Sequence, residues 1–204
     1  MGKIISVVGN LGAGKTTLTK LICDKGLYIP YPERPEERPF HTKYGKDQQR
    51  WALANQIDFF LYRCEQEANA RKSNKIAVFD GGFDQDFHVF TRHIFNRGYL
   101  NQDELNVCKR FYHLTREFLP PPDLIIRIIV DIPTLLQRRS LRGRKTDEHL
   151  FGMQELTCFE QLIEKWFEHE ISSPILQFSY EHDFHSFTNE IDTLVNQITM
   201  LLAA

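Results

Sequence analysis

The sequence has none of the features that mark a membrane-spanning or secreted protein. No apolar run approaches the ~20 residues that a transmembrane helix needs, and the first residues lack the apolar region and cleavage site of a secretory leader. The four cysteines (Cys23, Cys64, Cys108 and Cys158) form no C-x-x-C pair, which argues against a zinc knuckle or a disulfide framework. We therefore expect a cytoplasmic protein with no membrane partner.

A strong excess of charge of either sign is also absent. The chain has 25 lysines and arginines against 27 aspartates and glutamates, a net charge of −2. This balance argues against a polybasic protein that binds nucleic acid. A hydrophobic fraction of 42% is ordinary for a folded chain, and 204 residues fit one domain better than two. We therefore expect a single domain over residues 1–204 and no nucleic-acid partner.

Short apolar runs alternate with longer segments of helical periodicity. The runs expected as strands are 4–8, 27–29, 76–79, 124–130 and 175–179. Helices are expected from residue 16 and over 47–71, 84–95, 103–118, 133–141, 154–170 and 187–202. Four prolines make 30–39 an extended loop. The alternation predicts an α/β fold, a doubly wound five-stranded parallel sheet with helices on both faces.

A phosphate-binding loop is the strongest motif. GNLGAGKT at 9–16 matches G-x-x-x-x-G-K-[ST] and stands between an apolar run and a helical segment. Backbone N–H groups of such a P-loop converge on phosphate, the lysine reaches the β- and γ-phosphates, and the threonine hydroxyl ligates Mg²⁺. We therefore expect ATP and Mg²⁺ as cofactors. The expected nucleotide-binding residues are Gly9, Asn10, Gly12, Ala13, Gly14, Lys15, Thr16 and Thr17, and Asp80 is expected near Mg²⁺, directly or through water.

Six segments spread along nearly the whole chain belong to one pattern. They are GNLGAGKTT at 9–17, ERPEERPF at 33–40, YGKDQQRWALANQ at 44–56, DGGFDQDFHVF at 80–90, PPDLIIRI at 121–128 and QRRSLRGR at 137–144. In these segments the chain resembles the deoxynucleoside kinase family of P-loop phosphotransferases. The resemblance implies a P-loop kinase with an arginine-rich lid at about 137–148, a nucleoside-like acceptor and, commonly, a homodimer.

The resemblance also assigns roles in the acceptor site. Glu33 matches the general base of the family, Gln56 and Arg63 match base-reading residues on one helix, and Asp86 and Phe90 match a base-reading carboxylate and a stacking ring. Because Gln56 and Arg63 are seven positions apart, they share a helix face. An amide, a guanidinium and a carboxylate favour a purine or cytosine over thymine.

The residues alone leave plainer interpretations open. Glu33 could be a solvated charge in an acidic loop, since Glu36 and Glu37 are close by. Gln56 and Arg63 could lie on an exposed helix face with an ion pair.

The lid holds five cations in eight positions, Arg138, Arg139, Arg142, Arg144 and Lys145. Arg138 and Arg142 share a helix face and could clamp the transferring phosphoryl oxygens. With Lys15, Glu33 and Arg144 they form the expected catalytic set. A solvated basic helix is the alternative, and no interleaved aromatic residues favour RNA binding.

The sequence departs from the family pattern at two positions. The tyrosine that holds the sugar 3′-hydroxyl falls on Gly45, with Tyr44 one step away, and the arginine that follows the acid after the third strand is Gly81. Beyond the lid, Asp147 or Glu148 is expected to contact the sugar.

The glycine at position 81 predicts either a substitute cation, for which Arg34 and Arg92 are candidates, or an acceptor pocket widened by Gly81 and Gly82. The predicted reaction is transfer of a phosphoryl group from ATP to the 5′-hydroxyl of a (deoxy)nucleoside. The alternatives are a kinase for a nucleotide or another metabolite, and a nucleotide-binding regulatory protein. His182 and His185 are expected in a surface turn, with no transition metal.

Overall fold

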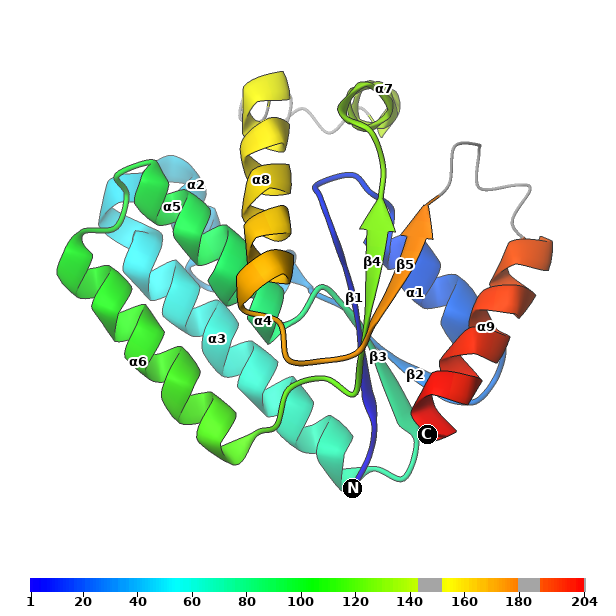
Figure 1. The fold of residues 1–204 in the computed structure, drawn as a ribbon. Coiled ribbons are helices and arrows are strands. Elements are labelled where there is room, and N and C mark those ends of the chain that lie inside the picture. The colour runs from blue at the N-terminus through cyan, green and yellow to red at the C-terminus, as the bar shows by residue number, and fades with distance from the viewer. Residues whose placement is uncertain (143–151, 180–187, 204) are drawn as a thin grey trace.

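The computed structural model describes residues 1–142, 152–179 and 188–203. Its centre is a five-stranded sheet in the order β2-β3-β1-β4-β5, with every neighbouring pair parallel (Figure 1). The strands are β1 (Ile4–Gly9), β2 (Tyr28–Tyr31), β3 (Ile76–Asp80), β4 (Leu124–Ile129) and β5 (Ile175–Ser179). The predicted doubly wound five-stranded parallel sheet is confirmed.

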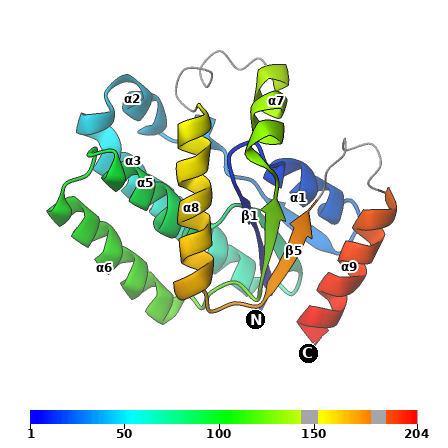
Figure 2. The same cartoon turned by 45° about the horizontal axis from the view of Figure 1, so that its top comes forward.

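Helices cover both faces of this sheet. They are α1 (Lys15–Cys23), α2 (His41–Lys46), α3 (Gln48–Lys72), α4 (Phe83–Gln85), α5 (Arg92–Asn96), α6 (Gln102–Phe118), α7 (Ile132–Arg142), α8 (Met153–His169) and α9 (Thr188–Ala203). Helices α1 and α9 lie on one side, whereas α3 and α8 lie on the other, with α6 outside α3 (Figure 1). Figure 2 brings forward the end of the sheet around which α2, α7 and the start of α8 gather.

The alternation of β1 explains these layers, since successive strand residues point to opposite faces. Ile5 and Val7 pack in one cluster with Leu18 of α1 and with α9. Val8 packs with α8, and Ile4 packs with Ala70 of α3. Because both faces are covered, the strand is apolar at nearly every position.

Helix α3 is unusual because its buried side is largely polar. Asp47 caps its N-terminus by accepting a hydrogen bond from the Arg50 amide at 3.1 Å. The polar residues that it buries are Asn55, Gln56, Arg63, Gln66, Glu67 and Arg71. The alternative of an exposed helix face at Gln56 and Arg63 is therefore wrong, and this helix needs partners for its polar groups inside the molecule.

Local structure differs from the expectation in two places. Within the predicted loop 30–39, Pro30 belongs to edge strand β2, where a missing N–H is tolerated, and Pro35–Glu37 forms a 3₁₀ turn. The predicted helix over 84–95 is interrupted by a π-helical segment, Asp86–Thr91, a deviation that often occurs at functional sites. Within the described ranges, no helix has the length and apolarity needed to cross a membrane.

Candidate active site

The carboxyl ends of three neighbouring strands bring the candidate site together. Val7 of β1 pairs with Asp80 of β3, so the P-loop after β1 lies beside the end of β3. The β2 strand ends at Tyr31 on the other side of β3, two residues before Glu33. Parallel sheets bind their ligands in the crevice outside these ends.

The P-loop backbone is shaped by its glycines. Gly12 and Gly14 have φ angles of 82° and 98°, in the left-handed region that favours glycine. Lys15 lies over the loop, and its Nζ donates to the carbonyl oxygens of Gly9 at 3.1 Å and Asn10 at 3.0 Å. The lysine charge therefore already sits at the concave side, where phosphate oxygens can replace the two carbonyls as acceptors.

Two side chains hold the P-loop from outside. Gln85 is buried and donates to the Gly9 carbonyl at 2.8 Å. The buried Asn10 side chain donates to the Leu156 carbonyl at 2.8 Å and to Glu160 Oε2 at 3.0 Å, both on α8. The side chain of Asn10 is thus committed to α8, and only its backbone is left for a nucleotide. Nothing in the sequence pattern marked Gln85 for this role.

Thr16 and Asp80 meet beside the loop. The Thr16 hydroxyl donates to Asp80 Oδ2 at 2.5 Å across 64 positions of sequence. This contact brings together the two residues that the sequence analysis assigned to Mg²⁺. Within the described part of the chain, no cluster of three or more histidine, cysteine, aspartate or glutamate side chains could hold a metal.

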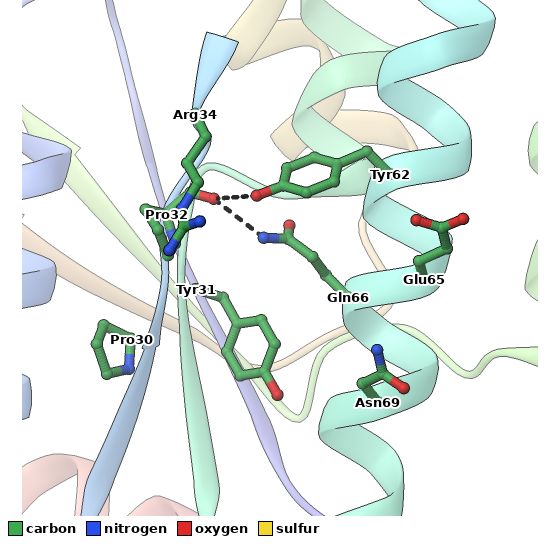
Figure 3. A pocket seen from close by; sticks show the side chains of 8 residues that line it. All are labelled: Pro30, Tyr31, Pro32, Arg34, Tyr62, Glu65, Gln66 and Asn69. Atoms are coloured by element: carbon green, nitrogen blue, oxygen red, sulfur yellow. Dashed lines mark hydrogen bonds between the residues drawn. The ribbon is translucent and has the colours of Figure 1, made fainter. Parts of the chain in front are cut away.

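The loop that carries Glu33 is fastened one residue earlier. Tyr62 and Gln66 of α3 both donate to the Pro32 carbonyl, each at 3.0 Å (Figure 3). Arg34 has φ 47°, which is uncommon for a residue with a side chain and indicates a backbone held in place by its surroundings. Glu33 is half-buried between these two points.

A cavity of about 280 Å³ adjoins this loop (Figure 3). Its lining consists of Pro30, Tyr31, Pro32, Arg34, Tyr62, Glu65, Gln66 and Asn69. The cavity opens beside edge strand β2, whereas Arg63 and Gln56 do not line it. We therefore place the reaction centre at the P-loop and not in this cavity.

Arg63 is fully buried at the centre of the site. Its Nε donates to Asp86 Oδ2 at 3.0 Å, Nη1 donates to Gln66 Oε1 at 3.2 Å, and Nη2 donates to the Asp80 carbonyl at 2.9 Å. Gln66 therefore binds the Pro32 carbonyl with one end and Arg63 with the other.

Opposite charges around Arg63 stabilise its cation. Burial alone would lower the pKa of Arg63, but Asp86, Glu33 and Asp80 together raise it. Burial raises the pKa of Asp86 to about 6, against the opposing charge of Arg63. Three carboxylates thus stabilise the Arg63 cation, and one of them is Glu33.

The other residues that the resemblance assigns to the acceptor site make separate contacts. Gln56 is buried and accepts a hydrogen bond from Thr91 at 2.9 Å, which fixes its amide. Phe90 is half-buried, with its ring 5.3 Å from that of Phe159. Tyr44 packs into the aromatic cluster around Phe60 and Phe87, and burial raises its pKa to about 12.

The second half of the predicted lid lies outside the described residues. Arg138 belongs to α7, and this helix ends at Arg142. Arg144, Asp147 and Glu148 fall in the undescribed range 143–151, as do His182 and His185 in 180–187. Their expected roles therefore stay predictions.

Neither sequence candidate for the substitute cation contacts Gly81. Arg34 is exposed and pairs with Glu37 at 3.1 Å, and the Arg92 guanidinium lies 5.5 Å from the ring centre of Phe87. Arg63 is the cation that lies there, since its Nη2 is 3.1 Å from the place that a Cβ on Gly81 would take.

A second buried polar network lies behind the site. Arg116 of α6 pairs with Glu67 through both carboxylate oxygens, at 2.7 and 3.1 Å, and with Asp84 at 2.9 Å. Tyr112 donates to Asp84 at 2.7 Å and contacts His88 Nε2 at 3.0 Å. The network joins α3, α4, α6 and the π-helical segment.

Comparison with known proteins places the chain among nucleoside-phosphorylating enzymes. The sequence profile of the family "Deoxynucleoside kinase" matches residues 5–203. The deoxyguanosine kinase of Bacillus subtilis (strain 168) is 30% identical over 164 residues, 78% of this chain and 74% of the relative. The deoxyadenosine/deoxycytidine kinase of the same organism is 24% identical over 206 residues, 98% of this chain and 93% of the relative.

A solved structure shares the fold. The deoxyadenosine kinase from M. mycoides with bound dCTP superposes with a TM-score of 0.79 at 23% identity, covering 97% of this chain and 99% of that one. The predicted family resemblance and the predicted P-loop kinase fold are both confirmed.

Proposed function

The chain belongs to the deoxynucleoside kinase family and is thus a phosphotransferase that uses an ATP-type nucleotide, and from that premise we propose its acceptor and its mechanism. The protein transfers the γ-phosphoryl group of ATP to the 5′-hydroxyl of a (deoxy)nucleoside and prefers a purine or cytosine base to thymine. The observation that carries this proposal is the position of Arg63, which donates both to the Asp86 carboxylate and to the Asp80 carbonyl beside the P-loop.

Phosphate binding is the task of the P-loop. The backbone N–H groups at the start of α1 and the Lys15 ammonium bind the β- and γ-phosphates. Lys15 exchanges the carbonyls of Gly9 and Asn10 for phosphate oxygens, so its charge needs little movement to reach the donor.

Thr16 and Asp80 fit a Mg²⁺ site. A hydroxyl and a carboxylate oxygen 2.5 Å apart are hard oxygen donors beside the phosphate loop, the type of ligand that this ion takes together with substrate phosphates. Bound there, the ion would neutralise charge on the β- and γ-phosphate oxygens.

Glu33 acts as the general base. The acceptor oxygen attacks the γ-phosphorus, the bond from phosphorus to the leaving oxygen of ADP breaks, and the hydroxyl proton passes to the Glu33 carboxylate. Arg138, Arg142 and Arg144 of the lid neutralise the charge on the transferring group.

Gln56, Asp86 and Phe90 hold the base of the acceptor. The Gln56 amide and the Asp86 carboxylate offer both donor and acceptor atoms, which suits the edge of adenine, guanine or cytosine better than that of thymine. The Phe90 ring stacks on the base, whereas Tyr44 and Glu148 hold the sugar.

Exposed apolar side chains on α3 and α6 also suggest a homodimer. Helices α3 and α6 expose the apolar residues Leu61, Val107, Leu114 and Phe118, of which Phe118 is 77% exposed. Burying such side chains between two copies is favourable, because each removes apolar surface from water. Light scattering that reports a monomer of 24.0 kDa would contradict this proposal.

The test is turnover of purified protein with ATP, Mg²⁺ and each of the four common deoxynucleosides, measured as nucleoside monophosphate by chromatography. We expect product from deoxyadenosine, deoxyguanosine or deoxycytidine, and little from thymidine. Lys15→Ala should abolish transfer, whereas Lys20→Ala, which changes an exposed lysine on the same helix, should leave it unchanged.

The role of Glu33 is tested by a matched pair of variants. Glu33→Gln should lower kcat by roughly 10²–10⁴-fold, as for loss of a general base. Glu36→Gln, on the adjacent 3₁₀ turn, should not. Turnover of thymidine alone would overturn the base preference, and an unchanged rate in Glu33→Gln would overturn the assignment of the base.

A further inference from the structure

The backbone at Gly81 has a conformation that excludes an ordinary side chain. Its φ is +78°, where residues with a Cβ are strained, and an added Cβ would lie 3.1 Å from Arg63 Nη2. The difference from the family pattern is therefore more than a missing arginine side chain, because the main chain here lies in the left-handed region and the Arg63 guanidinium occupies the adjacent space. The expectation that the two glycines widen an acceptor pocket stays a prediction.

We propose that Arg63 is the cation of the acceptor hydroxyl in this protein and that it acts on phosphoryl transfer more than on base recognition. The inference rests on the proposed function, since it concerns the same transfer. It gives Arg63 the task of holding Glu33 and the attacking oxygen together, and it leaves base recognition to Gln56 and Asp86.

The hydrogen bonds of Arg63 support this assignment. Three of the five N–H donors of a guanidinium are directed to Asp86, Gln66 and the Asp80 carbonyl, which fixes the plane of the group. The Asp80 carbonyl stands at the end of β3, beside the side chain that meets Thr16. One edge of Arg63 thus points to the P-loop side of the site.

Gln66 connects Arg63 to the loop that carries the general base, Glu33. Its amino group donates to the Pro32 carbonyl at 3.0 Å (Figure 3). Its carbonyl oxygen accepts from Arg63 Nη1 at 3.2 Å, and Pro32 stands one residue before Glu33. Tyr62 donates to the same carbonyl but makes no such bond to Arg63. Gln66 is therefore a positioning residue that couples the two groups.

The chemistry follows from this arrangement. As the acceptor oxygen attacks phosphorus, its proton goes to Glu33 and negative charge develops on the oxygen. The Arg63 guanidinium stabilises that charge. This effect acts during transfer and is nearly the same for every base.

The experiment separates the two roles of Arg63 by comparing kcat and KM over deoxyadenosine, deoxyguanosine and deoxycytidine. Arg63→Lys should lower kcat about 10–100-fold for each nucleoside, with KM and the order of preference among bases nearly unchanged. If Arg63→Lys leaves kcat for the best nucleoside intact and instead changes the order of preference more than tenfold, the residue reads the base and the inference is wrong.

A second pair of variants covers the case that Arg63→Lys does not fold, which circular dichroism would show. Gln66→Leu keeps the cation but cuts its link to the Glu33 loop, whereas Tyr62→Phe removes only the other bond to Pro32. We expect the loss of kcat to be at least fivefold larger in Gln66→Leu. Equal losses would overturn the inference, and a wild-type protein inactive on every nucleoside would overturn the proposed function and the inference with it.

Discussion

Two nearly buried arginines, Arg63 and Arg116, show how the same side chain can serve activity or stability. Arg116 meets two carboxylates, taking both oxygens of Glu67 and one of Asp84, and joins three helices. Arg63 makes one carboxylate bond, to Asp86, and spends its other observed bonds on neutral oxygens of Gln66 and Asp80. Arg116 thus gives its carboxylate partners three direct hydrogen bonds, whereas Arg63 gives only one and directs the rest of its observed bonds to neutral groups beside the P-loop.

The difference follows from position. Arg116 lies between α6, α3 and α4, away from the strand ends, where unpaired charge would only cost stability. Arg63 lies beside the P-loop, and its bond to the Asp80 carbonyl directs part of its guanidinium to the ends of the strands. A buried arginine is therefore informative about function when its hydrogen bonds are divided between a carboxylate and neutral groups at such an edge.

Breaking the Arg116 network should have the largest effect on stability. Arg116→Met leaves Glu67 and Asp84 without a cation, and burial raises the pKa of Glu67 further once the opposing charge is gone. We expect the free energy of unfolding in urea to fall by about 3–5 kcal/mol, while kcat of the folded protein changes little. Arg110→Met, at an exposed position of α6, is the control; a loss below about 1 kcal/mol in Arg116→Met would show that the carboxylates find other partners.

The second-largest effect on stability is expected from acid, which acts on the same network through His88. Burial lowers the pKa of His88 to about 4 from an ordinary 6.5, although Glu170 lies 3.2 Å away and opposes the shift. As the pH falls from 6.5 to 4, the unfolded chain takes up a proton at this residue before the folded chain does, so stability is lost. We expect roughly 2–3 kcal/mol over this range.

Urea unfolding at several pH values measures this loss. His88→Gln should flatten the pH dependence by a similar amount, whereas His41→Gln, at an exposed position, should not. An unchanged slope in His88→Gln would assign the acid sensitivity to other groups.

The smallest effect is expected from one hydroxyl. Tyr112→Phe keeps the ring, which stacks on Phe87 at 4.1 Å, but removes the group that donates to Asp84 and contacts His88. We expect a loss of about 1–1.5 kcal/mol and no change in kcat. In a double-mutant cycle with Arg116→Met, the double variant should lose less free energy of unfolding than the two single variants lose together, because both variants act on Asp84. A loss equal to that sum would show that the two contacts are independent.

The sheet and the P-loop could be predicted from the sequence because their signals are local. Short apolar runs followed by glycine-rich or helical segments have few other interpretations, and the motif at 9–16 fixes its own backbone. The positions of Glu33, Gln56 and Asp86 came from the resemblance, since each is an ordinary polar residue by itself.

The substitute for the missing arginine could not be predicted in the same way. Arg34 and Arg92 are near Glu33 and Phe90 in sequence, but Arg63 reaches Gly81 from a different helix, and such a contact depends on how α3 packs on β3. Helix α2 and the π-helical segment were missed for a related reason, because packing decides both and local periodicity shows neither.

The two hydrogen bonds from Asn10 to α8 link that helix directly to the phosphate loop. Glu160, which accepts one of them, also pairs with Arg127 of β4 at 3.0 Å, so loop, helix and strand share a single linkage. Coupling between two sites is reciprocal, so a nucleotide that stabilises the loop must also change the free energy of local unfolding of α8. The stability of α8, which follows the predicted lid in the sequence, can therefore depend on whether a nucleotide occupies the loop, even if no side chain of α8 contacts that nucleotide.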